Sequence, residues 1–118
     1  MSHLSILPTV LQDETLLAAA LEELHLPVVQ GGDLRGFADE REPVVLQTQL
    51  TSGLWIGWRR QPDGSLALVG DLQRLGRSTS PQQLIGRITR CYATLLALRS
   101  ASEPWASSLH QATVHVSV

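Results

Sequence analysis

Residues 54–72 most strongly constrain the fold, because they predict one long β-hairpin. Pro62-Asp63-Gly64 at the centre is a turn sequence: proline fixes φ, aspartate bonds its own backbone, and glycine accepts positive φ. On either side apolar residues alternate with period two, which is typical of strands in a half-buried sheet. Ile56 and Trp58 fall on one face and Trp55 on the other, so we expect helices or a partner to cover both faces.

Gly57 and Gly70 lie on opposite arms of this hairpin. They either face each other or make room for Trp55 or Trp58. The strand register alone distinguishes these arrangements.

Two helices flank the hairpin. Asp13 is a suitable N-cap for the first, which should end near His25, because Pro27 disfavours helical geometry at the residue before it. Ser80-Pro81 is a strong start for the second. The second helix has a predicted core stripe at Leu84, Ile88, Cys91, Leu95 and Leu98, with Ile85 and Tyr92 on its flank.

Further strands are expected at 5–11, 28–30, 44–50 and 112–118, and irregular segments at 33–43 and 73–79. Pro8 cannot donate to a ladder, so the first strand should lie at an edge or be bulged. The order favours an α+β fold: an antiparallel sheet of about five or six strands with two helices on one face, a ferredoxin-like variant. A chain of 118 residues suits a single domain over residues 1–118.

Composition excludes several classes of function. The net charge of −2 argues against a nucleic-acid surface. All nine basic residues are arginine, which excludes Schiff-base and P-loop lysine chemistry. Cys91 is the single cysteine, so the chain has no internal disulfide, which suits a reducing compartment. Apolar runs are too short for a membrane span, and no secretory signal is evident, so we expect a cytoplasmic protein.

The sequence predicts no catalytic residues, no metal site and no cofactor. The four histidines lack metal-ligand spacing, and no Gly-x-Ser-x-Gly motif is present. An enzyme is therefore the less favoured reading.

Polar residues outside the predicted core are the candidates for binding. Asp33 and Arg35, in the glycine-bounded segment before Phe37, and Asp71 at the end of the hairpin either pair with one another or bind a polar ligand. We favour the structural pair, which contributes about 0–1 kcal/mol at a surface.

Aromatic residues provide the other candidates. Trp55 and Trp58 near Arg59-Arg60 resemble a basic-aromatic nucleic-acid surface, although core positions are favoured for both rings. Trp105 lies in a predicted loop and is the better candidate for a partner contact. Tyr92 completes a possible ligand site with residues 33–37 and Asp71.

The chain resembles the hypothetical chloroplast reading frame thirty-five family of cyanobacteria, plastids and other bacteria, a domain of unknown function. The matching segments lie in order along nearly the whole chain: Met1 to Ser5, Leu17 to Leu24, Asp33 to Phe37, Leu54 to Asp71, Leu84 to Ala93 and Val114 to Val118. Leu4 replaces the family's usual Phe, and lysines common in relatives are missing. The resemblance implies no assigned activity, and the frequent gene neighbour, an AAA+ ATPase, implies a partner.

These observations favour a non-enzymatic interaction or adaptor protein that self-associates as a homodimer and serves an AAA+ ATPase. We expect neither nucleic acid nor membrane as a partner. The alternative is a small-ligand-binding regulatory domain that uses the loop at residues 33–37.

Overall fold

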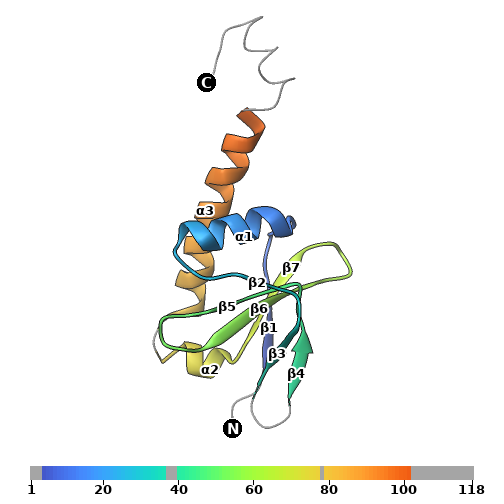
Figure 1. Ribbon diagram of the computed structural model, residues 1–118, viewed down its shortest axis with the longest axis vertical. Coiled ribbons are helices and arrows are strands. Elements are labelled where there is room, and N and C mark those ends of the chain that lie inside the picture. Colours follow the sequence, from blue (N-terminus) through green and yellow to red (C-terminus); the bar gives the residue numbers. More distant parts are fainter. Residues whose placement is uncertain (1–3, 37–39, 78, 102–118) are drawn as a thin grey trace, which may run out of the picture.

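The structure is a computed structural model and describes residues 4–36, 40–77 and 79–101 (Figure 1). Within these residues the chain forms seven strands and three helices. In order they are β1 (Ser5–Pro8), α1 (Glu14–Glu23), β2 (Val29–Gln30), β3 (Asp33–Arg35), β4 (Arg41–Pro43), β5 (Leu46–Gln49), β6 (Trp55–Arg60), β7 (Leu66–Gly70), α2 (Leu72–Leu75) and α3 (Pro81–Ala101).

The main sheet has five strands in the order β1-β7-β6-β5-β2, and every pair is antiparallel. The fold is therefore α+β, as predicted. β1 lies at an edge, which agrees with Pro8, a residue without a backbone donor. The strand predicted at 112–118 lies outside the described residues, and the ferredoxin-like arrangement and the single domain stay predictions.

The predicted hairpin is present as β6 and β7, with Trp58 opposite Leu68 and Gly64 at a φ of 90° in the turn. The register answers the question of the two glycines. Gly57 lies opposite Val69 rather than opposite Gly70. A Cβ on Gly70 would lie 3.1 Å from Ile56 Cγ2, so this glycine makes room for Ile56 and for neither tryptophan.

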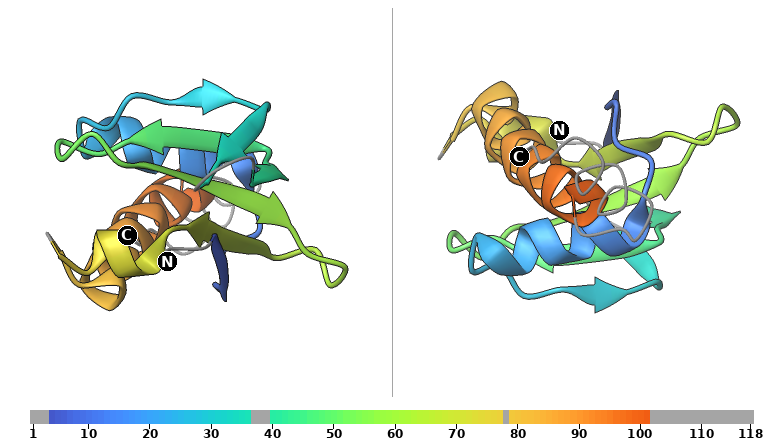
Figure 2. Two further views of the ribbon diagram at one scale, coloured as in Figure 1. Left: turned by 90° about the horizontal axis from the view of Figure 1, so that it is seen from below. Right: turned by 90° about the horizontal axis from the view of Figure 1, so that it is seen from above.

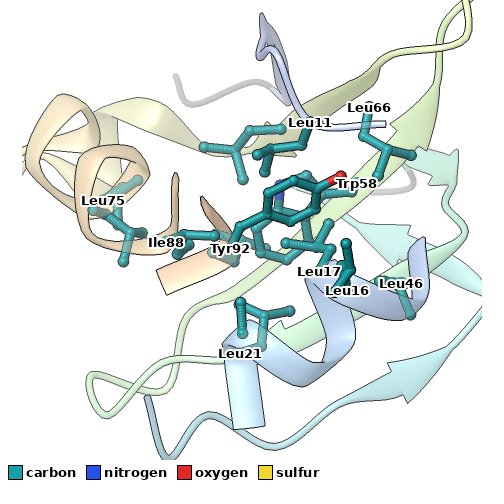
Figure 3. Close-up of a cluster of buried hydrophobic side chains, with 14 residues drawn as sticks. Leu11, Leu16, Leu17, Leu21, Leu46, Trp58, Leu66, Leu75, Ile88 and Tyr92 are labelled. Carbon is teal, nitrogen blue, oxygen red and sulfur yellow. The ribbon is translucent and has the colours of Figure 1, made fainter. Parts of the chain in front are cut away.

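The inner face of the sheet packs against α1 and α3, which lie across each other in Figures 1 and 2. Trp58 is 1% exposed and belongs to the main core together with Leu17, Leu66 and Tyr92 (Figure 3). Burying a tryptophan removes a large apolar area from water, so this contact contributes much of the stability of the sheet–helix packing.

α1 begins as predicted at Asp13. The Asp13 carboxylate accepts a hydrogen bond from Leu16 N at 3.1 Å, which satisfies one of the free N–H groups of the first turn. The Tyr92 hydroxyl accepts from Asp13 N at 3.0 Å, and Arg99 forms an ion pair with the same carboxylate at 2.9 Å. The helix N-terminus is thereby tied to α3.

The prediction of an irregular loop at 33–43 is wrong, because β3 and β4 pair there as a small two-stranded ribbon. Leu34 is fully buried and forms a second core with Val44 and Val69 on the outer face of the main sheet. A two-stranded ribbon can bury its apolar side against this face of the sheet, whereas a solvated loop cannot.

Two contacts hold this ribbon against β6. Arg59 Nη1 lies 2.8 Å from Glu42 Oε2. A Cβ on Gly57 would lie 2.9 Å from Val44 Cγ1 and 3.1 Å from the backbone oxygen of Leu46, so only glycine lets the layers approach this closely. The outer face is therefore covered by the chain itself along part of its length.

The segment after the hairpin also differs from the prediction. Residues predicted as irregular contain α2, whose N-cap is Asp71, and the Asp71 carboxylate accepts a hydrogen bond from Arg74 N at 3.1 Å. Leu75 is fully buried in the main core. The cap and the buried leucine both stabilise this single helical turn.

α3 begins after Ser80, whose hydroxyl accepts from Gln83 N at 3.4 Å. Its buried residues are Leu84, Ile88 and Tyr92, so Tyr92 belongs to the core stripe rather than to its flank. Leu98 is 62% exposed, which contradicts its predicted core position. The reason is visible in Figure 1, where the C-terminal turns of α3 extend beyond α1 and the sheet.

The close approach at Gly57 predicts the effect of adding a methyl group. Gly57→Ala should lower the free energy of unfolding by roughly 1–3 kcal/mol, because Val44 and the β5 backbone must move away from the added methyl group. Gly86→Ala is the matched control. Its Cβ meets only the mobile end of Arg90 at 3.3 Å, and alanine should stabilise the helix by up to about 1 kcal/mol. Urea unfolding measures both changes, and equal stability of the two variants would contradict this account.

The Asp13 cap predicts a pH dependence. The hydrogen bond from Leu16 N and the Arg99 guanidinium hold the pKa of Asp13 below its ordinary value of 3.8. The stabilisation is therefore fully present above the pKa of the unfolded chain and is lost as the pH falls through the lower folded pKa. Asp13→Asn, which still caps, should reduce the loss of stability in acid.

Urea unfolding between about pH 7 and pH 2.5 tests this, with the exposed Glu23→Gln as the control. An Asp13→Asn variant with the same acid-dependent loss as the unaltered chain would show that this carboxylate does not contribute.

Candidate functional site

A hollow of about 230 Å³ lies on the outer face of the sheet beside the β3–β4 ribbon. Asp33 and Arg35 of β3, Gln47 of β5 and Trp55 of β6 line it. Three strands therefore position these groups. On β3, Leu34 is buried in the second core, and its neighbours Asp33 and Arg35 stay exposed. We call these four residues the outer-face hollow.

The two charged groups of the outer-face hollow have no ion-pair partner among the described residues. The described ion pairs are Arg59–Glu42, Arg60–Glu14 and Arg99–Asp13, so Asp33 and Arg35 do not form the structural pair that we favoured from the sequence. Exposed carboxylate and guanidinium groups next to each other can bind complementary charges of a partner.

The uncharged residues complete the hollow. Trp55 is 38% exposed, which leaves part of its ring accessible, and the tryptophan face can accept an apolar or cationic group. Gln47 Nε2 donates to Gly31 O at 2.9 Å, which orients the amide and leaves its oxygen available. The hollow therefore offers one aromatic surface, one anion, one cation and an amide.

The other predicted site residues lie elsewhere or have structural contacts. Trp58 is in the main core, Asp71 is 6% exposed and caps α2, and the Tyr92 hydroxyl bonds the start of α1. Phe37 and Trp105 lie outside the described residues. Of the seven predicted residues, the structure thus brings Asp33 and Arg35 together on one surface.

Sequence reasoning did not select Trp55 and Gln47 as site residues. A signal was present for Trp55, because the period-two alternation assigned it to the face opposite Trp58. The face covered by two helices had to take one of the two rings, and the other was left for the outer side. Gln47 had no comparable signal, since its neighbours across the sheet depend on the register.

The described residues contain no group of three or more His, Cys, Asp or Glu side chains able to hold a metal ion. In the same part of the chain, no helix combines the length and apolarity that crossing a bilayer requires.

Comparison with known proteins shows the family. Residues 20–112 match the family described as protein of unknown function (DUF1257), and the chain belongs to this family. The matched range includes all four residues of the outer-face hollow. No curated protein and no solved structure matches the chain.

Replacing the two tryptophans of β6 should lower stability by very different amounts. Trp58→Ala should cost about 3–5 kcal/mol, because it leaves a cavity in the main core. Trp55→Ala should change stability by less than about 1 kcal/mol, since the ring lies at the surface. Urea unfolding of the two variants checks this, and a Trp55→Ala variant as unstable as Trp58→Ala would place Trp55 in the core.

Proposed function

We propose that the protein is a non-enzymatic interaction module that binds a protein partner through the outer-face hollow. The observation that supports this proposal is the exposed Trp55 ring beside the unpaired Asp33 and Arg35. Tryptophan and arginine are enriched among the residues that contribute most to protein–protein binding.

The size of the hollow favours a protein partner over a small molecule. Ligand pockets usually enclose about 300–1,000 Å³ and bury most of the ligand. The outer-face hollow has about 230 Å³ and is open to solvent. It is large enough for one side chain of a partner, while the rest of the partner lies over the ribbon and the sheet.

The chemistry of the hollow indicates what that partner presents. An apolar or cationic side chain suits the Trp55 ring and Asp33, and a neighbouring carboxylate suits Arg35. Exposed charges of opposite sign, neither of which forms an ion pair with a described residue, favour a partner with the complementary pair.

The alternative is a regulatory domain that binds a small polar ligand at residues 33–37. The same unpaired Asp33 and Arg35 support it, because a zwitterionic metabolite would satisfy both charges. The small volume of the hollow argues against it.

We also propose that, within its family, the chain belongs to the chloroplast reading frame thirty-five group of cyanobacteria and plastids. The proposal further includes an AAA+ ATPase as the partner, self-association as a homodimer and a cytoplasmic location. These follow from the resemblance and the composition described above, and the exposed Trp55 surface is compatible with each protein partner.

Photo-crosslinking tests the proposed surface. A benzoylphenylalanine incorporated at position 55 should crosslink to a protein in the source lysate, and combined Arg35→Ala and Asp33→Ala substitutions should reduce the yield severalfold. The partner is then identified by mass spectrometry, and the purified pair should bind at least about 10-fold more weakly when Trp55 is replaced by alanine.

Arg41→Ala is the matched control, because Arg41 is an exposed arginine of the same ribbon outside the hollow. Crosslinks that survive the Asp33 and Arg35 substitutions unchanged would contradict the proposal. A metabolite retained by the native protein in mass spectrometry, and lost from the same double variant, would favour the ligand-binding alternative.

A further inference from the structure

A second hollow, of about 350 Å³, lies where the end of α1, the β5–β6 turn and the start of α3 meet. Leucines from all three segments form its apolar part: Leu24, Leu26, Leu50 and Leu84. His25, Arg87 and the hydroxyl residues Thr51, Ser52 and Thr79 form its polar part. No aspartate or glutamate lines this hollow, which we call the helix-end hollow.

A strongly basic segment forms one side of the helix-end hollow, where Thr79, Leu84 and Arg87 line it. Residues 72–101 contain five arginines and no carboxylate side chain, although the whole chain has a net charge of −2. The rest of the chain carries the other four arginines and all eleven carboxylates. The start of α3, which belongs to this segment, lines the hollow together with the β5–β6 turn.

Most of these arginines have free guanidinium groups. Arg74, Arg77, Arg87 and Arg90 are all exposed, and none forms an ion pair with a described residue. Arg87 and Arg90 also line a shallow hollow of about 480 Å³ along α3, so Arg87 is shared by two adjoining hollows. Like charges this close repel one another, and an anionic partner would relieve the repulsion.

We propose that this surface binds an acidic peptide segment of a protein partner, with an apolar side chain in the helix-end hollow and carboxylates at Arg87 and Arg90. The proposal goes beyond the proposed function, because none of the residues that line the outer-face hollow lines either of these hollows. The two surfaces are on different elements and can be altered separately.

The apolar leucines and the charge distribution distinguish a peptide from other polyanions. A phosphate backbone has no apolar group to place among four leucines. Nucleic acid and anionic bilayers also extend beyond the basic segment and would meet the remainder of the chain, where all eleven carboxylates lie. A short acidic peptide needs to cover only the two hollows, and no carboxylate lines either of them.

Fluorescence anisotropy with defined peptides tests the proposal. The probe is a fluorescein-labelled heptapeptide with two glutamates, glycine, leucine, glycine and two glutamates. The unaltered protein should bind it in low salt and release it in about 0.5 M NaCl, because surface charges are screened there. The peptide with serine in place of leucine should bind more weakly, and the peptide with lysines in place of glutamates should not bind.

Charge reversal localises the binding. The double variant R87E/R90E should bind the glutamate peptide about 10-fold more weakly, because two attractive charges are replaced by two repulsive ones. Arg41→Glu, which makes the same change on the β3–β4 ribbon, should bind as the unaltered protein does. Circular dichroism confirms that each variant is folded.

The proposal is overturned if the glutamate peptide does not bind at millimolar protein, if the lysine peptide binds equally well, or if R87E/R90E has no effect. Tighter binding of a 20-base-pair DNA duplex or of phosphatidylserine vesicles would also overturn it and would assign the surface to that polyanion. Trp55→Ala should leave peptide binding unchanged, so failure of this proposal is separate from failure of the outer-face proposal.

Discussion

The packing of Trp58 against two helices is the contact on which the rest of the structure depends. The ring lies on β6, the middle strand of the sheet, and is covered by residues of α1 and α3. Because successive side chains of a strand point to opposite faces, this burial fixes the orientation of every neighbour on β6. Ile56 must then point inward, whereas Trp55, Gly57 and Arg59 must point outward.

The outward residues of β6 each contribute differently to the second layer. Gly57 lets Val44 approach, Arg59 forms an ion pair with Glu42, and together they hold the β3–β4 ribbon on the sheet. Trp55 lies where the ribbon leaves the sheet partly uncovered, and there Asp33 and Arg35 border it. The candidate site is therefore a consequence of incomplete coverage: a two-stranded ribbon is too narrow to cover a five-stranded sheet.

The sequence predicted the elements whose signals are local. The turn at Pro62 to Gly64, the Asp13 cap and the position of β1 at an edge each depend on one or a few residues, and the structure has all three. The β3–β4 ribbon was missed because Leu34 is a single apolar residue among polar ones. Its burial depends on Val44 and Val69, which are distant in the sequence.

The site was predictable in part for the same reason. The glycine-bounded segment marked Asp33 and Arg35 as exposed, but their neighbours Gln47 and Trp55 come from strands whose register no local pattern fixes. Similarly, the apolar spacing of α3 continues to Leu98, but the sheet and α1 do not extend far enough to bury this residue (Figure 1). Periodicity reports a possible apolar face, and the length of the surface opposite it decides how much of that face is buried.

The length of α3 gives the molecule a gradient of local stability. Its 21 residues extend roughly 32 Å at 1.5 Å per residue, yet its buried residues end at Tyr92 and its last core neighbour is Leu95. The final turns can therefore fray without any loss of apolar core packing, although fraying at Arg99 breaks its ion pair with Asp13, while the first turns open only when the core itself opens. A single continuous helix thus joins the most persistent part of the structure to one of its most labile parts.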